Sequence, residues 1–380
     1  MRVTIAERPE ELEELEEEWW QLLERGPADP VFGSPVWARQ WWLHLAEKDD
    51  RLCLARLKDS GELAGLAPLY LTKEAWGPFQ ARVLRILGQS AADYSDLLWP
   101  ARLEEMKLLL QALLERQDWD VLSLSRLPGH SPTRPAISQA ALALGLESLE
   151  EDEEVCPFFG LEGSFEDYFT RRFQRPSRKR IRRMSRHLAE RGQHRFELWQ
   201  SGEGLEEILE KLAGLEARAW QGRRGVGLFS QPKRRGFFFS IARFLAERGE
   251  LAIHLQWLDD KLMDYHFGFI AQARYYDFSV AFDPDFAEYS PGVLSLVDLV
   301  SRCFELGIKR FDLMRGGEPY KASWTDQASQ NVNLYLFAPR PRARLLKTWL
   351  SSRLKLRRLK GRLKRTDPHQ GFRIMAGEAA

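Results

Sequence analysis

One short stretch of the sequence has the residue types needed to hold an anion against the main chain. Tyr289-Ser290-Pro291-Gly292-Val293 lies between a predicted strand and a predicted helix. Proline suits the first helical position because it has no amide hydrogen and a preset φ, and glycine lets a ligand approach the backbone. Free amides and the positive end of the helix dipole attract phosphate. The stretch is a candidate seat for a cofactor diphosphate; the alternative is an ordinary helix start.

Four side chains near this stretch could move protons. His266 lies in a strand-like run, where alternation places it on one face with Asp264, and Asp312 ends a short apolar run. Glu318 and Tyr320 lie in a Gly/Pro loop, a common place for reactive groups. Imidazole and carboxylate groups can serve as bases and a phenol can donate a proton, so Tyr320 could be a proton donor. The structural alternatives stay open: a packed histidine or tyrosine, and an Asp312 bound to arginine or backbone.

The second half of the chain must form the elements that position these residues. Asp259-Asp260 predicts a tight hairpin turn between two strands, and the next strands and helices follow in alternation. We expect helices over 205–220, 233–248 and 291–306, and strands over 251–258, 261–272, 274–282, 310–314 and 331–337. The strand over 310–314 is expected to lie parallel to the third strand. Three antiparallel strands, a helix and then a strand parallel to the third make a distinctive order.

The first half reads as mixed α and β. Strands are expected over 51–57, 63–71, 83–87, 94–99 and 119–124, and helices near the N-terminus, over 106–116 and over 137–144. A Pro/Gly/Ser loop follows the last strand, and the acidic stretch 147–154 has the composition of a domain boundary.

A longer motif follows the predicted anion seat: Phe311-Asp312-Leu313-Met314-Arg315-Gly316-Gly317-Glu318-Pro319-Tyr320-Lys321-Ala322-Ser323-Trp324. At this distance after a Tyr-Ser-Pro-Gly helix start, it resembles the GNAT-superfamily branch described as acetyltransferases associated with cellulose biosynthesis. Members look like tandem GNAT folds related to the Fem-type peptidyltransferases. The resemblance is specific from about residue 251 to 324 and vaguer before it. Members often carry an acid where Gly317 stands, so this chain departs from the pattern there.

The resemblance implies the fold class and the domains. We expect an α+β (mixed α/β) chain of two tandem GNAT-like domains, each a mixed, mostly antiparallel sheet flanked by helices. They would span residues 1–155 and 156–338, the second holding an acyl-CoA site, with a basic amphipathic tail over 339–380.

The resemblance also implies a site. In GNAT folds the third and fourth core strands splay, here 274–282 and 310–314, and an acyl thioester enters between them. Its diphosphate would rest on Tyr289, Ser290, Pro291, Gly292 and Val293. Arg315, Lys321 and Trp324 would then shape the acceptor side.

Positive charge is concentrated in two segments. Residues 171–195 hold eleven Lys or Arg against one acid, and residues 340–365 hold twelve against none, although the whole chain has a net charge of only +1. The first segment predicts a helix with Ile181, Met184 and Leu188 inward, and suits a phosphorylated ligand, anionic lipid or RNA backbone. The second suits either an anionic membrane surface or a helix docked on the acidic body.

Composition excludes several classes. With 44% hydrophobic residues, no long apolar run and an acidic N-terminal region, the chain is expected to be globular and cytoplasmic, without a membrane span. Cys53, Cys156 and Cys303 are few and widely spaced, so neither a disulfide framework nor a metal cluster is expected.

These observations predict an enzyme that moves an acyl group from acetyl-CoA or another acyl-CoA to an amine or hydroxyl. The acceptor would be a cell-envelope, polysaccharide or lipid-linked molecule, at the inner membrane surface if the tail binds lipid. Transfer would be direct, since no cysteine lies near the motif. One alternative is an aminoacyl-tRNA-dependent Fem-type peptidyltransferase, with tRNA on the basic segments. Another is a non-enzymatic, membrane-associated binding protein on a GNAT scaffold.

Overall fold

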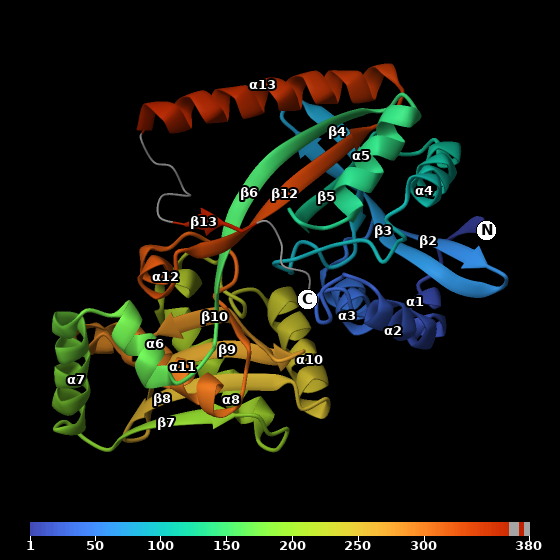
Figure 1. Ribbon diagram of the computed structural model, residues 1–380. Coiled ribbons are helices and arrows are strands. Elements are labelled where there is room, and N and C mark those ends of the chain that lie inside the picture. Colours follow the sequence, from blue (N-terminus) through green and yellow to red (C-terminus); the bar gives the residue numbers. More distant parts are fainter. Residues whose placement is uncertain (365–371, 376–380) are drawn as a thin grey trace. The chain divides into compact units, whose positions relative to one another are not determined.

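The chain forms two compact units in the computed structural model, which describes residues 1–364 and 372–375 (Figure 1). Unit 1 comprises Met1–Val155 together with Ser329–Ala380, and unit 2 comprises Cys156–Ala328. Unit 2 contains every residue proposed from the sequence for catalysis, cofactor binding or acceptor binding.

Unit 2 is a mixed sheet with helices on both faces. Its strands are the end of β6 (Glu147–Gly160), then β7 (His194–Trp199), β8 (Leu251–Leu258), β9 (Lys261–Ala271), β10 (Arg274–Phe282) and β11 (Arg310–Asp312). Its helices are α6 (Phe165–Arg172), α7 (Arg175–Ala189), α8 (Leu205–Arg218), α9 (Trp220–Arg223), α10 (Pro232–Glu247), α11 (Pro291–Glu305) and α12 (Pro319–Trp324), with a 3₁₀ turn η1 (Pro284–Tyr289). The strand order is β6-β11-β10-β9-β8-β7.

The predicted core order is confirmed. β8 and β9 pair through the turn at Asp259-Asp260, where Asp259 adopts a left-handed φ of 52°. β10 pairs antiparallel with β9 and parallel with β11, as the sequence predicts. A parallel neighbour needs a crossover, and α11 supplies it between β10 and β11. The helix therefore begins beside the end of β10, which is where the site lies.

Two sets of helices cover the two faces of this sheet. Leu296 and Leu299 of α11 pack with Tyr275 of β10 on one face. On the other face, Tyr265 of β9 donates a hydrogen bond to Glu216 of α8. Because both faces are covered, every residue of β8 is buried.

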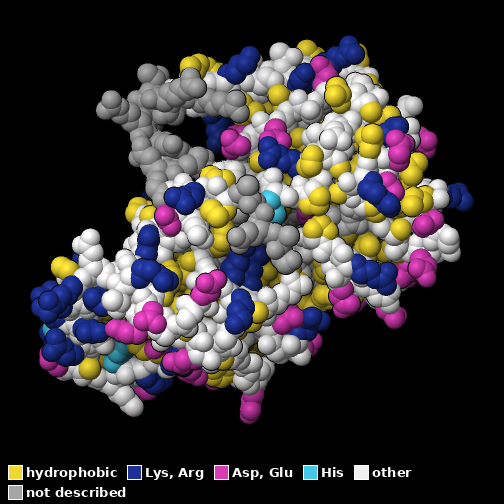
Figure 2. Space-filling view, viewed as in Figure 1, with side chains coloured by type: hydrophobic (Ala, Val, Ile, Leu, Met, Phe, Trp, Pro, Cys, Tyr) yellow, Lys and Arg dark blue, Asp and Glu magenta, His cyan; other side chains and the backbone are white. Residues whose placement is uncertain are grey.

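The basic helix α7 attaches through its apolar stripe. Leu188 is buried with Leu294 at the start of α11, and Ile181 and Met184 pack against the same cluster. The predicted inward positions of Ile181, Met184 and Leu188 are confirmed, and the arginines between them remain at the surface. Figure 2 shows Lys and Arg side chains gathered over α7.

Unit 1 is a second mixed, mostly antiparallel sheet, with strand order β1-β2-β3-β4-β5-β12 followed by the first part of β6. Its further strands are β1 (Arg2–Ala6), β2 (Arg51–Asp59), β3 (Glu62–Trp76), β4 (Phe79–Ile86), β5 (Val121–Pro128), β12 (Gln327–Phe337) and β13 (Arg373–Ile374). Its helices are α1 (Glu11–Glu14), α2 (Glu16–Arg25), α3 (Pro35–Leu45), α4 (Leu103–Arg116), α5 (Thr133–Ala143) and α13 (Pro341–Lys364). The predicted fold class, two mixed and mostly antiparallel sheets flanked by helices, is confirmed.

Three local expectations differ from the structure. The acidic stretch 147–154 is not a linker but the first part of strand β6, whose acids lie at the half-exposed or exposed positions. Residues 94–99 do not form a strand and contribute one isolated bridge, Leu66 to Leu98. The strand over 331–337 belongs to unit 1 instead of unit 2, because it pairs with β5.

The basic tail is also part of unit 1. Ala343, Leu346, Leu350 and Leu354 of α13 are buried in the core of that unit, which is the docked arrangement that the sequence left open. Leu345, Leu356 and Leu359 remain exposed on the same helix. Within the described residues, no helix combines the length and the apolar character needed to cross a bilayer.

Candidate active site

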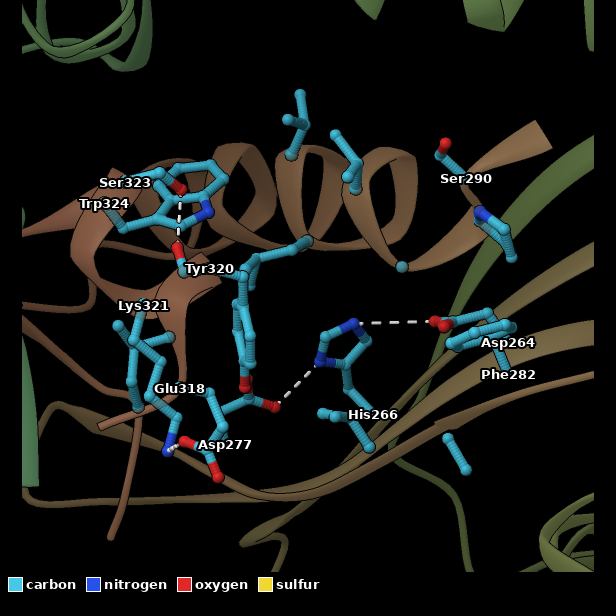
Figure 3. Close-up of a pocket in the computed structure, with 18 of the residues that line it drawn as sticks. Asp264, His266, Asp277, Phe282, Ser290, Glu318, Tyr320, Lys321, Ser323 and Trp324 are labelled. Carbon is cyan, nitrogen blue, oxygen red and sulfur yellow. Dashed lines mark hydrogen bonds and ion pairs between the residues drawn. The ribbon is translucent and has the colours of Figure 1, made fainter. Parts of the chain in front are cut away.

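Unit 2 contains a cavity of about 650 Å³ beside the start of α11 (Figure 3). One wall is the second half of β10, the opposite wall is the chain that follows β11, and the start of α11 closes one end. Apolar side chains form much of the lining, among them Ile181, Phe278, Leu296 and Trp324. Buried polar atoms face this apolar space from β9 and β10.

The cavity exists because two neighbouring strands part. β10 and β11 pair only over Arg274–Tyr276 and Arg310–Asp312. A bulge in β10 follows at once, since its register with β9 shifts between Tyr276 and Ser279. A bulge bends the strand and re-aims its side chains. The divergence matches the splayed strands that the GNAT resemblance implies.

Three buried side chains form an acid–histidine–acid row in the cavity wall. His266 Nδ1 lies 2.8 Å from Asp277 Oδ1, and His266 Nε2 lies 3.5 Å from Asp264 Oδ1. All three residues are less than 5% exposed. A carboxylate at neutral pH only accepts hydrogen bonds, so Nδ1 carries the proton toward Asp277 and Nε2 faces the cavity. Asp277 therefore fixes the tautomer and the orientation of the ring.

Several polar atoms of this row have no hydrogen-bond partner among the described residues. They are His266 Nε2, Asp264 Oδ1 and Asp277 Oδ2. Buried polar atoms in native proteins are almost always paired, and exceptions concentrate at functional sites. A ligand that brings hydrogen-bond donors into the cavity would satisfy them.

The charges of the row shift the pKa values in a way that suits proton transfer. Burial opposes the charged imidazolium, but the Asp277 and Asp264 carboxylates outweigh it and raise the pKa of His266. Burial raises the pKa of Asp264 to about 6, although His266 and Ser295 act in the opposite direction. Perturbed groups of this kind in a cleft are typical of catalytic sites.

Replacing Asp264 with asparagine is expected to stabilise the protein at neutral pH. The folded protein holds a proton on Asp264 up to a pKa of about 6, whereas the ordinary value is 3.8, so ionisation costs stability as pH rises through this window. The gain for Asp264→Asn should reach up to about 3 kcal/mol at pH 7.5 and vanish below pH 4. Urea unfolding of both proteins at the two pH values measures it. A less stable variant at pH 7.5 would show instead that the Asp264–His266 ion pair supports the fold.

The predicted anion seat lies at the start of α11. Ser290 adopts a left-handed conformation with φ 51°, which is uncommon for a residue other than glycine, and its side chain makes no capping hydrogen bond. Pro291 has no amide hydrogen, and the Val293 amide donates to the Ser290 carbonyl at 3.1 Å. The Gly292 amide and the Ser290 hydroxyl are thus the donors available to a ligand. A Cβ at Gly292 would meet only Asp264 Oδ2, at 3.5 Å.

Of the predicted cofactor residues, Ser290, Pro291, Gly292 and Val293 line the cavity. Tyr289 does not line it. Its ring lies 5.7 Å from that of His187 on α7 and packs against the core cluster beneath α7. Tyr289 thus packs outside the cavity, between the start of α11 and α7.

Tyr320 and Glu318 reach the cavity from the opposite wall. Figure 3 shows the Tyr320 ring pointing toward Asp277 and His266. Although Tyr320 as a whole is 39% exposed, burial of its phenol end and the neighbouring carboxylates, Asp277 foremost, hold the pKa of Tyr320 well above its ordinary value, so the hydroxyl stays protonated. Glu318 is bound to Lys321 at 2.9 Å. The phenol is therefore available as a proton donor, whereas the Glu318 carboxylate is held by a cation.

Asp312 occupies a different place from the one expected of a base. It is fully buried, forms ion pairs with Arg274 and Arg310, and accepts a hydrogen bond from the Met314 amide at 2.8 Å. It is not among the residues that line the cavity. These contacts match the alternative that Asp312 is bound to arginine and backbone, and the arginines are Arg274 and Arg310.

The predicted acceptor-side residues all line the cavity, with different degrees of freedom. Lys321 is 3% exposed and donates hydrogen bonds to the carbonyls of Met314 and Arg315 at 3.2 and 2.8 Å, so it closes the loop after β11. Trp324 packs beside Phe159 and Phe173 and forms part of the core. Arg315 borders the opening between these elements.

Sequence reasoning missed Asp277 altogether and used Asp264 only as a neighbour of His266. Alternation in β9 places Asp264 and His266 on one face, which was a usable signal. Asp277 gave no such signal. Val280 pairs with His266, and regular alternation along the strand from Val280 would put Asp277 on the opposite face. The bulge inserts one residue and returns it to the face of His266.

The described residues contain no cluster of three or more His, Cys, Asp or Glu side chains placed to hold a metal ion. Cys303 lies in the last turns of α11 and is buried in the core, and burial raises the pKa of its thiol. A thiol with a raised pKa is a poor nucleophile at neutral pH.

Comparison with known families fits this geometry. Residues 175–322 match the family described as acetyltransferase (GNAT) domain. This stretch is similar to GNAT-type acyltransferase domains. The GNAT domain so defined begins with α7 and includes the acid–histidine–acid row, the start of α11 and the loop after β11. The narrower resemblance to the cellulose-biosynthesis branch remains a prediction.

Solved structures share the fold over most of the chain. FemX is 13% identical and superposes with a TM-score of 0.55. The match covers 89% of this chain and 97% of the FemX chain. A conserved protein of unknown function from Bacteroides thetaiotaomicron is 11% identical over 88% of this chain and 100% of its own, with a TM-score of 0.52. L-PGS from Bacillus licheniformis is 12% identical, with a TM-score of 0.50. The match covers 91% of this chain and 96% of the L-PGS chain. At these identities the likeness shows the fold alone. The curated proteins contain no match to the sequence.

Proposed function

We propose that the GNAT domain transfers an acyl group directly from acetyl-CoA or another acyl-CoA to an amine or hydroxyl of an envelope, polysaccharide or lipid-linked acceptor. One observation carries the proposal: a buried histidine, held by Asp277, presents to the cavity beside the proposed anion seat an Nε2 that has no hydrogen-bond partner among the described residues. The two features lie where a thioester and its diphosphate would have to lie for direct transfer.

The residues of the cavity fit such a donor. The apolar lining suits a pantetheine arm and an acyl chain, and the Ser290 hydroxyl and Gly292 amide can donate to a diphosphate. The thioester supplies an activated acyl group. The protein holds that group between the wall of β10 and the loop after β11, so that the acceptor approaches from the side of His266.

His266 acts as the general base in this proposal. Its Nε2 accepts the proton that the acceptor loses as the new acyl bond forms, and Asp277 stabilises the resulting imidazolium. Asp264 lies beside Nε2, so two hydrogen-bond acceptors face the same space. An amine brings more than one hydrogen and can satisfy both acceptors, which favours an amine over a hydroxyl.

Tyr320 acts as the proton donor to the leaving group. When the carbon–sulfur bond breaks, the thiolate needs a proton, and the phenol is protonated at every physiological pH. His266 then releases the proton that it took, and the Tyr320 phenolate takes up one proton from solvent, so both side chains return to their starting states. The transfer reaction therefore needs no redox partner and no covalent enzyme intermediate.

A thermal-shift titration tests whether this donor binds. Saturating acetyl-CoA or a longer acyl-CoA should raise Tm, because a ligand at a hundred times its Kd stabilises the folded state by about 2.7 kcal/mol. Free pantetheine, which lacks the diphosphate, serves as the weak-binding control. No stabilisation at millimolar thioester would count against the proposal.

The exposed apolar residues of α13 support an acceptor at a membrane surface. Leu345, Leu356 and Leu359 lie among basic residues of this helix and face solvent. Such a face suits peripheral attachment to anionic lipid. We accordingly place the enzyme in the cytoplasm, at the inner membrane surface.

The alternative donor is an aminoacyl-tRNA, as in a Fem-type peptidyltransferase. The exposed basic residues of α7, among them Arg175, Lys179 and Arg182, give this candidate its support. RNA binding through such residues weakens steeply with added salt, and copurified nucleic acid raises the absorbance at 260 nm. Tight, salt-sensitive tRNA binding without any response to CoA thioesters would favour this second donor.

A further inference from the structure

A second hollow of about 620 Å³ lies along α7 on the outside of the GNAT domain. Its lining consists of Arg180, Arg183, Met184, Arg186, His187, Glu190, Glu288 and Ser290. Ser290 lines both this groove and the active-site cavity. The groove is therefore continuous with the anion seat at the start of α11.

The arginines of this α7 groove come from one helical face. Arg180, Arg183 and His187 follow each other at spacings of three and four, so they lie in a row along the helix. The row extends over roughly 10 Å, given the rise of an α-helix. Ile181, Met184 and Leu188 anchor the helix in the core, so the row is held at a fixed place beside Ser290.

No acidic side chain in the described part of the chain neutralises these guanidinium groups. Among the described residues, Arg180, Arg183 and Arg186 form no ion pair, although Glu190 and Glu288 also line the groove. Arg182, which faces elsewhere on the same helix, is instead 3.7 Å from Glu166. Guanidinium groups bind phosphate in a forked, charge-assisted arrangement. A row of free arginines next to a hydroxyl that reaches the catalytic cavity is suited to phosphate groups of a ligand whose other end lies in that cavity.

We infer that the α7 groove binds the nucleotide end of the acyl donor, with Arg180 and Arg183 contacting the 3′-phosphate of CoA. The inference rests on the proposed function, since it needs the diphosphate at Ser290 and Gly292. The length of the row suits two phosphate groups separated by a ribose. The diphosphate would lie at the Ser290 end, and the 3′-phosphate would lie along the arginines.

Calorimetric titration with CoA and dephospho-CoA tests the inference, because the two ligands differ only in the 3′-phosphate. The wild-type protein should bind CoA at least about tenfold more tightly, the effect of one charge-assisted phosphate contact. The double variant Arg180→Ala/Arg183→Ala should lose this preference and keep its affinity for dephospho-CoA. The matched variant Lys179→Ala/Arg182→Ala removes the same charge from the same helix outside the groove and should keep the preference.

The outcomes separate this inference from the proposed function. Equal wild-type affinities for CoA and dephospho-CoA overturn the inference while leaving acyl-CoA as the donor. A preference that survives in the groove variant, or that both double variants lose equally, also overturns it. If neither ligand binds, the proposed function itself fails. Loss of binding to phosphatidylglycerol vesicles in the groove variant alone, with no CoA preference in the wild type, would assign the groove to a lipid headgroup instead.

Discussion

Replacing His266 with glutamine is expected to lower kcat by between about a hundredfold and ten-thousandfold, the usual contribution of a positioned general base. Glutamine can still donate a hydrogen bond to Asp277, so the fold should persist, but its amide cannot accept a proton. Steady-state rates with a saturating acyl-CoA and a small amine acceptor, normalised to folded protein, measure the effect.

His254 supplies a matched control for this variant. It is as deeply buried as His266 and pairs directly with it across β8 and β9, but its ring is bound to Ser295 and Asp298, at 3.1 and 2.8 Å. It does not line the cavity. His254→Gln should therefore lose stability, by about 1–3 kcal/mol, and keep most of its activity. Equal losses of activity in the two variants would mean that His266 acts only through the fold.

The pH profile gives His266 a second signature. A general base works only when neutral, so kcat/KM should rise with pH along an acidic limb. Because Asp277 and Asp264 raise the pKa of His266, that limb should lie above the ordinary histidine value of 6.5. The limb should disappear in His266→Gln. Its persistence in the variant would assign the limb to another group.

Replacing Gly292 with aspartate is expected to weaken acyl-CoA binding on the order of a hundredfold, because a carboxylate in the seat repels the diphosphate by several kcal/mol. Gly292→Ala is the matched control, since a Cβ at this position meets Asp264 Oδ2 only at an ordinary contact distance of 3.5 Å. An acid in the first turn of a helix is otherwise favourable, so α11 should still form.

A second ligand sharpens this experiment. An acyl-pantetheine carries the thioester but no diphosphate, so its affinity should change little between the wild type and Gly292→Asp. If the aspartate weakens the two ligands equally, the start of α11 does not bind the diphosphate. If the aspartate weakens the binding of neither ligand, the acyl donor does not bind beside the start of α11.

The elements around the site could be predicted from the sequence because their signals are local. The Asp259-Asp260 turn fixed the register of β8 and β9, and alternation in β9 aligned Asp264 with His266. The Ser-Pro-Gly junction located the start of α11. The stripe of Ile181, Met184 and Leu188 oriented α7.

The remaining features depend on pairing between distant segments. The bulge that brings Asp277 beside His266 appears only in the register of β10 against β9. The sequence left open whether Asp312 is a base or is bound to arginine or backbone, and β10 and β11 together bring Arg274 and Arg310 against it. Alternation within one strand carries no information about such contacts.

The chain divides after Val155, where the sequence analysis divided it, but the acidic stretch before that point is a strand instead of a linker. A run of acids between residues 147 and 154 has the composition of a linker, yet the neighbouring strand and the basic helix α13 supply partners for it. Lys347 binds Glu147 and Arg357 binds Glu151, at 2.8 and 2.7 Å. The paired residues are 200 and 206 positions apart in sequence, so neither charged segment alone indicates the other.

A crystal structure of the protein soaked with a non-hydrolysable acetyl-CoA analogue tests the central claim most directly. The account predicts density for the diphosphate within hydrogen-bonding distance of the Gly292 amide and the Ser290 hydroxyl, with the sulfur-bearing end directed to His266. Density for the ligand elsewhere, or none here at a concentration that saturates binding in solution, would contradict it.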